Sequence, residues 1–244
     1  MTVKAPFSGN VPFARIVRGL HLKDVVAVQR GLARFDSEAP PTIKNLWEIH
    51  VRRDPKYDEP DDGIIRRIGQ DGQDHKVFLH YRPDLPQLLA GSGIRLKLWQ
   101  CTWFAACGRI WTACAVATDE LAKEMDKMRP GFRFAERAAQ YRDQHVLRVI
   151  KYDQRPNRLA DEHSDRSAIT FRIAESHPGF YTKDGWNRQF YDAPATPKVD
   201  CFAGDQLEHI TRGGIRRVWH GADDSTGGAE TRSVVVFFGK MYPK

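Results

Sequence analysis

One stretch of the chain says more about its fold than any other. It reads Asp161-Glu162-His163-Ser164-Asp165-Arg166-Ser167-Ala168-Ile169-Thr170-Phe171-Arg172-Ile173, so a polar H-x-D triplet runs directly into an alternating apolar segment. Because residues i and i+2 of a strand project from the same face, His163 and Asp165 could bind one metal ion from adjacent corners. About one such triplet is expected by chance in a chain of 244 residues, so the surrounding sequence must carry the argument.

The sequence around this triplet reads as a series of short strands. After residue 142 the strand candidates are separated by turns rich in Gly and Asp, which is typical of a β-sandwich or barrel. A third metal ligand would come from another strand, and His220 is the candidate because it follows the apolar pair Val218-Trp219. Two His and one carboxylate form the facial triad of non-haem iron(II) oxygenases, which keeps open positions at the metal. The strand candidates are 146–152, 168–173, 204–208, 218–220 and 232–238.

The sequence before this β-rich part has a different character. The stretch 96–129 carries apolar residues at helical spacing, is rich in Ala and lacks Pro, so it predicts one long helix or two consecutive ones. Pro130-Gly131 ends it, and residues 133–142 predict a shorter helix. Further upstream, 64–68 and 77–81 look like short strands between polar loops. The order is therefore helices first and a β core second.

An arginine opens the last apolar strand candidate. Arg232 precedes Ser233-Val234-Val235-Val236-Phe237-Phe238, and a charge in such a place is costly if it is buried without a partner. Arg pairs well with a carboxylate in bidentate geometry, so the distal carboxylate of 2-oxoglutarate would suit Arg232. The competing interpretation is a surface arginine paired with Glu230.

Together these segments resemble a known family. Residues from about 146 to 238 resemble the C-terminal half of the isopenicillin N synthase-like, 2-oxoglutarate-dependent iron(II) dioxygenases, because five motifs occur in the same order. The motifs are Leu147-Arg148-Val149-Ile150-Lys151-Tyr152, His163-Ser164-Asp165-Arg166-Ser167-Ala168-Ile169-Thr170, Gly204-Asp205-Gln206-Leu207-Glu208 with Thr211-Arg212-Gly213-Gly214, Val218-Trp219-His220, and Arg232.

The resemblance implies a fold and a site. The fold is mainly β with helices, a double-stranded β-helix (jelly-roll, cupin-like) core with N-terminal helices packed on one sheet. Iron(II) would be bound by His163, Asp165 and His220, with 2-oxoglutarate held by Arg232 and Tyr152 and with dioxygen as the further reactant. We expect a single catalytic domain over residues 1–244, with a helix-rich part at 1–142 and the jelly-roll core at 143–244.

The activity that the resemblance implies is oxidation, most often hydroxylation, of an unactivated C–H bond in a small molecule, which could be anionic. Val234 stands where the family has a Ser that bonds the co-substrate, and the spacing from His220 to Arg232 is longer than usual. These departures keep open an iron oxidase or oxidative cyclase of the same fold that uses no 2-oxoglutarate. A binding domain without catalysis is a further alternative, in which His220 and Tyr152 would be ordinary core residues.

The charge of the chain bears on its partners. Lys and Arg number 38 against 31 Asp and Glu, which gives a formal net charge of +7. Short basic groups alternate with acidic ones and no basic run reaches five residues, so nucleic acid is not the expected partner, although a nucleic-acid demethylase stays as a rival. Lys151, Arg172 and Arg188 could meet an anionic substrate, but we interpret them as solvated charges.

The remaining sequence features concern the compartment. No apolar run reaches the roughly 20 residues that span a bilayer, so no membrane association is expected. The first residues lack the apolar stretch and cleavage site of a secretory signal, so we expect a cytoplasmic protein. The four cysteines, Cys101, Cys107, Cys114 and Cys201, form no C-x-x-C pair, which favours buried thiols in a reduced compartment over a zinc site.

Overall fold

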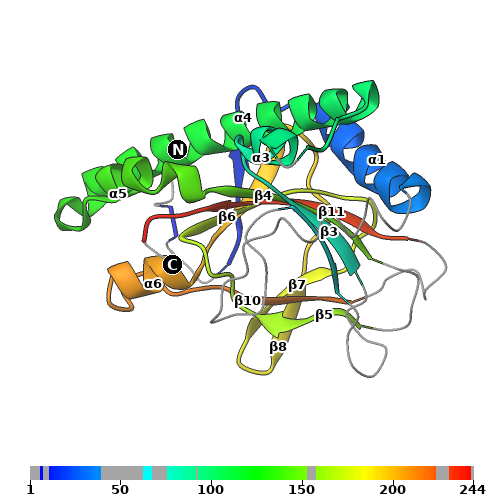
Figure 1. Cartoon of the computed structure of the whole chain (residues 1–244). Helices are drawn as coiled ribbons and strands as arrows, with labels where there is room; N and C mark the ends of the chain where they lie inside the picture. The colour runs from blue at the N-terminus through cyan, green and yellow to red at the C-terminus, as the bar shows by residue number, and fades with distance from the viewer. Residues whose placement is uncertain are drawn as a thin grey trace.

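The chain folds into two antiparallel sheets that face each other, with helices covering the outer face of the larger one (Figure 1). This architecture comes from a computed structural model that describes residues 6–7, 11–39, 63–67, 76–91, 93–152, 158–223 and 231–242. The prediction of a jelly-roll core with helices packed on one sheet is confirmed by it.

The larger sheet has seven strands and draws on both halves of the chain. N-terminal strands lie at both of its edges, because β1 pairs with β9 and the β2–β3 hairpin pairs with β4. The C-terminal strands therefore sit in the middle of the sheet, between partners from the first 81 residues. In spatial order the strands are β1 (Phe13–Ile16), β9 (Lys198–Ala203), β6 (Ile169–Glu175), β11 (Ser233–Gly239), β4 (Val146–Tyr152), β3 (Lys76–Tyr81) and β2 (Gly63–Arg67).

The smaller sheet has four strands and carries the H-x-D segment. Its register places His220 of β10 directly opposite His163 at the end of β5. On its other side β10 pairs with β7, which continues through a tight turn into β8. The strands in spatial order are β5 (Arg158–His163), β10 (Trp219–Asp223), β7 (Phe180–Asp184) and β8 (Asn187–Phe190).

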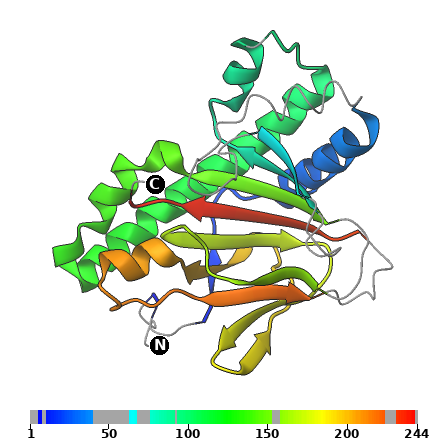
Figure 2. The ribbon, with the colours of Figure 1, turned by 60° about the horizontal axis from the view of Figure 1, so that its bottom comes forward.

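Helices α1, α3, α4 and α5 lie on one side of the large sheet, whereas α6 lies apart from them at one end of the sheets (Figure 1), and Figure 2 shows the long helix α4 running behind the large sheet. The stretch 96–129 forms one helix, α4, rather than two, and Pro130 opens a short 3-10 turn directly after it. Helix α1 packs closely on α4, because Gly31 has no side chain where a Cβ would lie 2.3 Å from the Trp103 ring. The helices are α1 (Leu22–Glu38), α3 (Leu85–Gly91), α4 (Leu98–Met128), α5 (Phe134–Gln140) and α6 (Asp205–Ile210), with 3-10 turns η2 (Pro130–Phe132) and η3 (Arg142–Gln144).

Strand alternation gives the large sheet two different faces. One face packs apolar side chains such as Leu147, Phe171 and Phe237 against the helices in the main core. The opposite face looks toward the small sheet, and a smaller apolar cluster that includes Phe78 and Ile150 joins the two sheets there. Since the helices cover only the first face, the polar residues that share the second face are directed into the space between the sheets.

One expected strand is wrong. Residues 204–208 form the start of helix α6 rather than the first strand of a hairpin. The physical reason is that Gly204 caps the helix, Asp205 and Glu208 lie in its first turn, where acidic side chains are favourable, and Leu207 is buried. Helix α1 and strands β1, β7, β8 and β9 were not expected from the sequence, and Ile68 of the expected strand 64–68 lies outside the described residues.

Two further expectations concern the cysteines and membranes. Cys107, Cys114 and Cys201 are buried free thiols as expected, whereas Cys101 is exposed. Among the helices in the described part of the chain, none combines the length and the apolar character that a membrane crossing requires.

Candidate metal centre and active site

Three potential metal ligands converge at one end of the space between the sheets. His163 ends β5, Asp165 follows two residues later, and His220 lies opposite His163 on β10. One ligand atom from each residue lies within 4.8 Å of the others. The Nε2 atoms of His163 and His220 are each 3.7 Å from Oδ1 of Asp165. The three residue types and their spacing match the face of an octahedral site.

The hydrogen bonds of the two imidazoles determine which nitrogen faces the centre. Nδ1 of His163 lies 2.6 Å from the carbonyl oxygen of Asp161, and Nδ1 of His220 lies 3.2 Å from that of Val218. Carbonyl oxygens only accept, so each Nδ1 carries a proton, and a neutral imidazole then offers its Nε2 lone pair toward Asp165. Burial lowers the pKa of His220, which favours its neutral form. Two Nε2 atoms and a carboxylate oxygen thus face one another, an arrangement that suits a bound cation.

Asp165 is held in place by its second oxygen. Thr170 Oγ1 donates a hydrogen bond of 2.7 Å to Oδ2 of Asp165, and the Ser167 hydroxyl lies 2.8 Å from Thr170 Oγ1. Burial acts to raise the pKa of Asp165, but His220, His163, the Thr170 hydroxyl and Arg148 together lower it below its ordinary value. The carboxylate therefore stays ionised, with Oδ2 tied to the sheet and Oδ1 facing the two imidazoles.

A cavity between the two sheets joins this centre to the rest of the expected site. It holds about 590 Å³ of empty space, counting its open mouth. The structure brings His163, Asp165, His220, Tyr152 and Arg232 to the wall of this one cavity. The other lining residues are Lys76, Arg148, Ile150, Ala160, Thr170, Arg172, Glu175, Phe180, Phe202, Gly221, Ala222, Val234, Val236 and Phe238.

Arg232 lies at the far end of the cavity, beside Tyr152. The two are neighbours across β4 and β11, since the Tyr152 N–H donates to the Arg232 carbonyl oxygen at 2.8 Å. Arg232 is only 3% exposed, so the interpretation as a surface arginine is wrong; Glu230 lies outside the described residues. Its Nε atom is buried and has no hydrogen-bond partner among the described residues. A buried guanidinium with an unused N–H beside a tyrosine fits one end of a dicarboxylate.

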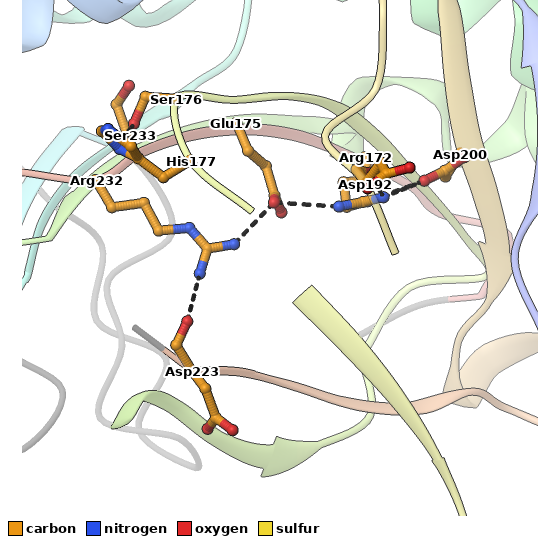
Figure 3. A network of polar contacts seen from close by, with 9 residues as sticks. All are labelled: Arg172, Glu175, Ser176, His177, Asp192, Asp200, Asp223, Arg232 and Ser233. Carbon is orange, nitrogen blue, oxygen red and sulfur yellow. Dashed lines mark hydrogen bonds and ion pairs between the residues drawn. The ribbon is translucent and has the colours of Figure 1, made fainter. Parts of the chain in front are cut away.

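Arg232 is the last member of a series of ion pairs, which Figure 3 shows. Arg232 Nη2 donates to Glu175 Oε2 at 2.8 Å, and Arg172 Nη1 lies 3.1 Å from the same oxygen. Arg172 also pairs with Asp200 and donates to the Asp192 carbonyl oxygen at 2.6 Å. Charges of opposite sign therefore alternate from Asp200 to Arg232, and Glu175 serves two guanidinium groups.

Three basic residues were interpreted from the sequence as solvated charges, and their surroundings in the structure differ. They are Lys151, Arg172 and Arg188. Arg172 is 1% exposed, so its interpretation as a solvated charge is wrong. Lys151 pairs with Asp36 at 2.5 Å on the helix side of the sheet, and Arg188 pairs with Glu162 at 2.8 Å on the small sheet. The sequence signal for Arg172 was available, because Thr170 and Arg172 alternate with apolar Phe171 and Ile173 and so share the inner face of the strand.

Two facing sheets around a His, Asp and His centre define a jelly-roll protein with a candidate mononuclear metal site of the facial-triad type. Comparison with known proteins adds a family match for part of the chain. Residues 143–240 match the family model of the 2OG-Fe(II) oxygenase superfamily. Its members are dioxygenases that use iron(II), 2-oxoglutarate and dioxygen, so the expected enzyme class and cofactors are confirmed. No curated protein matches the chain.

Solved structures share the fold over nearly the whole chain. The dioxygenase for auxin oxidation 1 of Arabidopsis thaliana, solved with 2-oxoglutarate, is 13% identical, with a TM-score of 0.68, and the match covers 95% of this chain and 84% of that one. A Neurospora crassa protein solved with alpha-KG and 5-formyluracil is 17% identical, with a TM-score of 0.66 and coverage of 93% and 73%. JOX2, solved with 2OG, Fe and JA, is 14% identical, with a TM-score of 0.62 and coverage of 95% and 68%. At these identities the likeness establishes the fold alone.

Proposed function

We propose that the chain is an iron(II)- and 2-oxoglutarate-dependent dioxygenase that hydroxylates an unactivated C–H bond of a small molecule. One observation carries the proposal: two imidazoles and a carboxylate converge on a cavity whose other end holds a buried arginine. The structural relatives solved with 5-formyluracil, with thymine or with JA support a small-molecule substrate.

In this proposal His163, Asp165 and His220 hold the metal. The backbone carbonyls of Asp161 and Val218 fix the two imidazoles with Nε2 inward, and Thr170 fixes the carboxylate. His220 is packed between the rings of Phe180 and Phe202, with centroid distances of 5.4 and 5.0 Å, so its ring has little freedom to turn away. The ligands are thus oriented before any metal arrives.

Arg232 and Tyr152 bind the distal carboxylate of 2-oxoglutarate in the same proposal. Glu175 and the Asp223 carbonyl oxygen each accept a hydrogen bond from one Nη atom of Arg232, and Nε has no partner among the described residues, so it is a donor that a carboxylate could use. Iron(II) with 2-oxoglutarate and dioxygen supplies the oxidising power, with succinate and carbon dioxide as by-products. The protein's part is to orient both reactants and to keep water away with apolar walls such as Phe180, Phe202 and Val236.

Residues 1–244 act as a single catalytic domain in this proposal. The argument is the strand order of the large sheet, in which β1 and the β2–β3 hairpin flank the strands of the C-terminal part. The cavity also draws Lys76 from β3, so the N-terminal part contributes to its wall.

The experiment that tests the proposal measures metal and co-substrate binding before turnover. Calorimetric titration of the anaerobic protein with iron(II), and then with 2-oxoglutarate, should give one site for each. His163→Ala should weaken iron binding at least 100-fold, whereas His177→Ala, which changes a partly exposed histidine outside the triad, should leave it unchanged. Absence of iron binding by the wild type would favour a non-catalytic binding domain.

The oxidase alternative rests on Val234, which lines the cavity next to Arg232 without the hydroxyl that the family motif has. Quantifying succinate separates the two activities. Under air, iron(II) and 2-oxoglutarate should yield succinate with the wild type, and Arg232→Gln should lower that yield at least tenfold at limiting 2-oxoglutarate. Oxygen consumption without succinate would identify the oxidase.

A further inference from the structure

One carboxylate oxygen in the series of ion pairs is shared by two guanidinium groups. Oε2 of Glu175 lies 2.8 Å from Nη2 of Arg232 and 3.1 Å from Nη1 of Arg172, and Figure 3 shows Glu175 between the two arginines. All three side chains are at most 4% exposed, so solvent screens their attraction only weakly. The position of the Glu175 carboxylate therefore depends on both arginines at once.

Arg172 is itself fixed by contacts with three other residues. Its Nε donates to Oδ2 of Asp200 at 3.1 Å, and its Nη2 donates to the carbonyl oxygen of Asp192 at 2.6 Å. The guanidinium carbon also lies 4.3 Å from the ring centroid of Phe180, on the facing sheet. Because these contacts hold Arg172 in one place, its remaining nitrogen, Nη1, holds the Glu175 carboxylate in place as well.

Glu175 engages Arg232 through a single nitrogen, which is an incomplete form of this pairing. A carboxylate that pairs with an arginine commonly accepts two parallel hydrogen bonds, for which the guanidinium offers Nη2 and Nε along one edge. Glu175 accepts from Nη2, and Nε of Arg232 has no partner among the described residues. Since Oε2 of Glu175 is shared with Arg172, the carboxylate is kept from turning fully onto the edge of Arg232.

We propose that Arg172 is a positioning residue that sets the specificity for 2-oxoglutarate: by holding Glu175 to one nitrogen of Arg232, it keeps the adjacent Nε–H open to the distal carboxylate. The inference rests on the proposed function and deepens it at the co-substrate anchor. Without Arg172, Glu175 closes onto Arg232 as a two-bond pair and takes the place of the co-substrate carboxylate. Arg172 thus acts on the co-substrate through Glu175 and Arg232.

The test compares 2-oxoglutarate with 2-oxopentanoate, which has the same carbon chain and lacks the distal carboxylate. Calorimetry on protein loaded with Mn(II) gives the ratio of the two dissociation constants. Both ligands share the keto-acid end, so the ratio isolates the contribution of the distal carboxylate. The wild type should bind 2-oxoglutarate about tenfold or more tightly than 2-oxopentanoate. Arg172→Met, whose apolar chain can still pack on Phe180, should lower this preference about fivefold or more.

A second substitution separates positioning from a general loss of structure. Adding Glu175→Gln to Arg172→Met removes the competing anion and restores the charge balance, so the preference should return to within about threefold of wild type. A merely structural role predicts no such recovery, because another ion pair is lost. Arg15→Met is the matched control: Arg15 pairs with Glu120 and Glu124 of α4 on the helix side of the large sheet, so its loss should leave the preference unchanged.

The outcomes distinguish this inference from the proposed function. Wild-type protein that fails to bind Mn(II) or 2-oxoglutarate contradicts the proposed function, and the inference with it. Normal binding by the wild type, with a preference that survives in Arg172→Met or that Glu175→Gln does not restore, overturns the role of Arg172 alone. If Arg172→Met does not fold, Arg172→Lys replaces it, and there the preference should fall about threefold or more, because a single ammonium lacks the fork that holds Asp200 and Glu175 together.

Discussion

At the residue scale, the orientation of Asp165 depends on one hydroxyl group. Thr170 is buried and donates to Oδ2, so Oδ1 is the oxygen that faces His163 and His220. Second contacts of this kind set how well a metal ligand is aimed. The sequence motif contains Thr170, but only the structure shows that its side chain reaches back to the carboxylate five residues earlier.

Thr170→Val tests this contact, because the substitution keeps the shape and removes the donor. We expect iron(II) affinity to fall about 10- to 100-fold, since Asp165 loses the bond that aims it. Metal titration under anaerobic conditions measures the effect. Thr182→Val is the matched control, because it removes a buried hydroxyl whose contact with Tyr191 is long, at 3.4 Å. Equal affinities in the two variants would contradict the role of Thr170.

Glu175 is a second decisive residue, because two buried guanidinium groups share its carboxylate. Glu175→Gln removes the negative charge and leaves Arg172 and Arg232 buried with one anion fewer between them. Breaking a buried ion pair in this way costs about 3 kcal/mol in free energy of unfolding, which urea denaturation measures.

The control for Glu175 is an exposed carboxylate of the same type. Glu38→Gln breaks the i,i+4 pair with Arg34 on α1, where both side chains are about half exposed. Such a pair is worth about 0.5 kcal/mol or less. A similar small loss in Glu175→Gln would show that solvent reaches the ion-pair chain and that the chain does not support Arg232.

At the element scale, the largest difference from the sequence expectation is helix α6. Its first N–H groups, those of Asp205 and Gln206, donate to the carbonyl oxygens of Asp165 and Ser167 at 2.8 and 3.0 Å. Gly204 permits this approach, because a Cβ there would lie 2.3 Å from the Ser167 carbonyl oxygen. The Gly-Asp motif was recognisable from the sequence, but the helix was not, since six residues are too few for a periodic pattern to show.

The backbone at Gly179, directly before β7, leads to a prediction about 2-oxoglutarate binding at Arg232. Gly179 has a φ of +142°, and a Cβ on it would lie 2.1 Å from the Asp223 carbonyl oxygen and 2.8 Å from Arg232 Nη1. Gly179→Ala should therefore displace Arg232 and weaken 2-oxoglutarate binding about tenfold or more, as read by calorimetry with Mn(II).

Gly185 in the β7–β8 turn provides the control for this substitution. Its φ is +60°, and a Cβ there would have no atom within 4 Å. Gly185→Ala carries the backbone cost of about 1 kcal/mol without a clash, so it should lower stability and leave 2-oxoglutarate affinity intact. Equal effects of the two substitutions on 2-oxoglutarate affinity would mean that Gly179 acts through backbone strain alone.

The contact between α4 and the large sheet predicts a pH dependence of stability. His145 is buried between Trp111 and Phe237, and its Nδ1 accepts the Lys240 N–H at 3.1 Å. Burial, then the charges of Arg142, Lys240 and Arg82, lower its pKa from 6.5 to about 3. The unfolded chain gains a proton on this residue below about pH 6.5 and the folded chain does not, so stability is lost as pH falls from about 6.5 toward 3.

His145→Asn keeps an acceptor near Lys240 and removes the titrating group. Between pH 7 and 4 the wild type should lose more free energy of unfolding than this variant, by at most about 1.4 kcal/mol per pH unit. Urea denaturation at several pH values gives both curves. Parallel curves would show that His145 is protonated in the folded protein as readily as in the unfolded chain.

At the scale of the whole molecule, the C-terminal part was far more predictable than the N-terminal part. Five motifs in order indicated the jelly roll, because metal and anion sites need particular residues at particular spacings. The N-terminal part carries no such residues, so α1 and β1 left no signal, although the Ala-rich run of α4 did. The alternation of β6 places Arg172 on the inner face, but the pairing of Arg148 with His80 and of Arg172 with Asp200 could not be assigned, because those partners come from strands far apart in sequence.

The strand order of the large sheet also governs when this protein can fold. β1 ends at Ile16 and the strand it pairs with, β9, begins at Lys198, so about 180 residues must leave the ribosome before that pairing can form. Until then β1 remains without its partner in the sheet, and the β2–β3 hairpin waits for β4, which begins at Val146. Long-range pairing of this kind makes folding slow and leaves strands open to association with other chains. Expression should therefore depend strongly on temperature and on chaperones, far more than the stability of the finished fold would suggest.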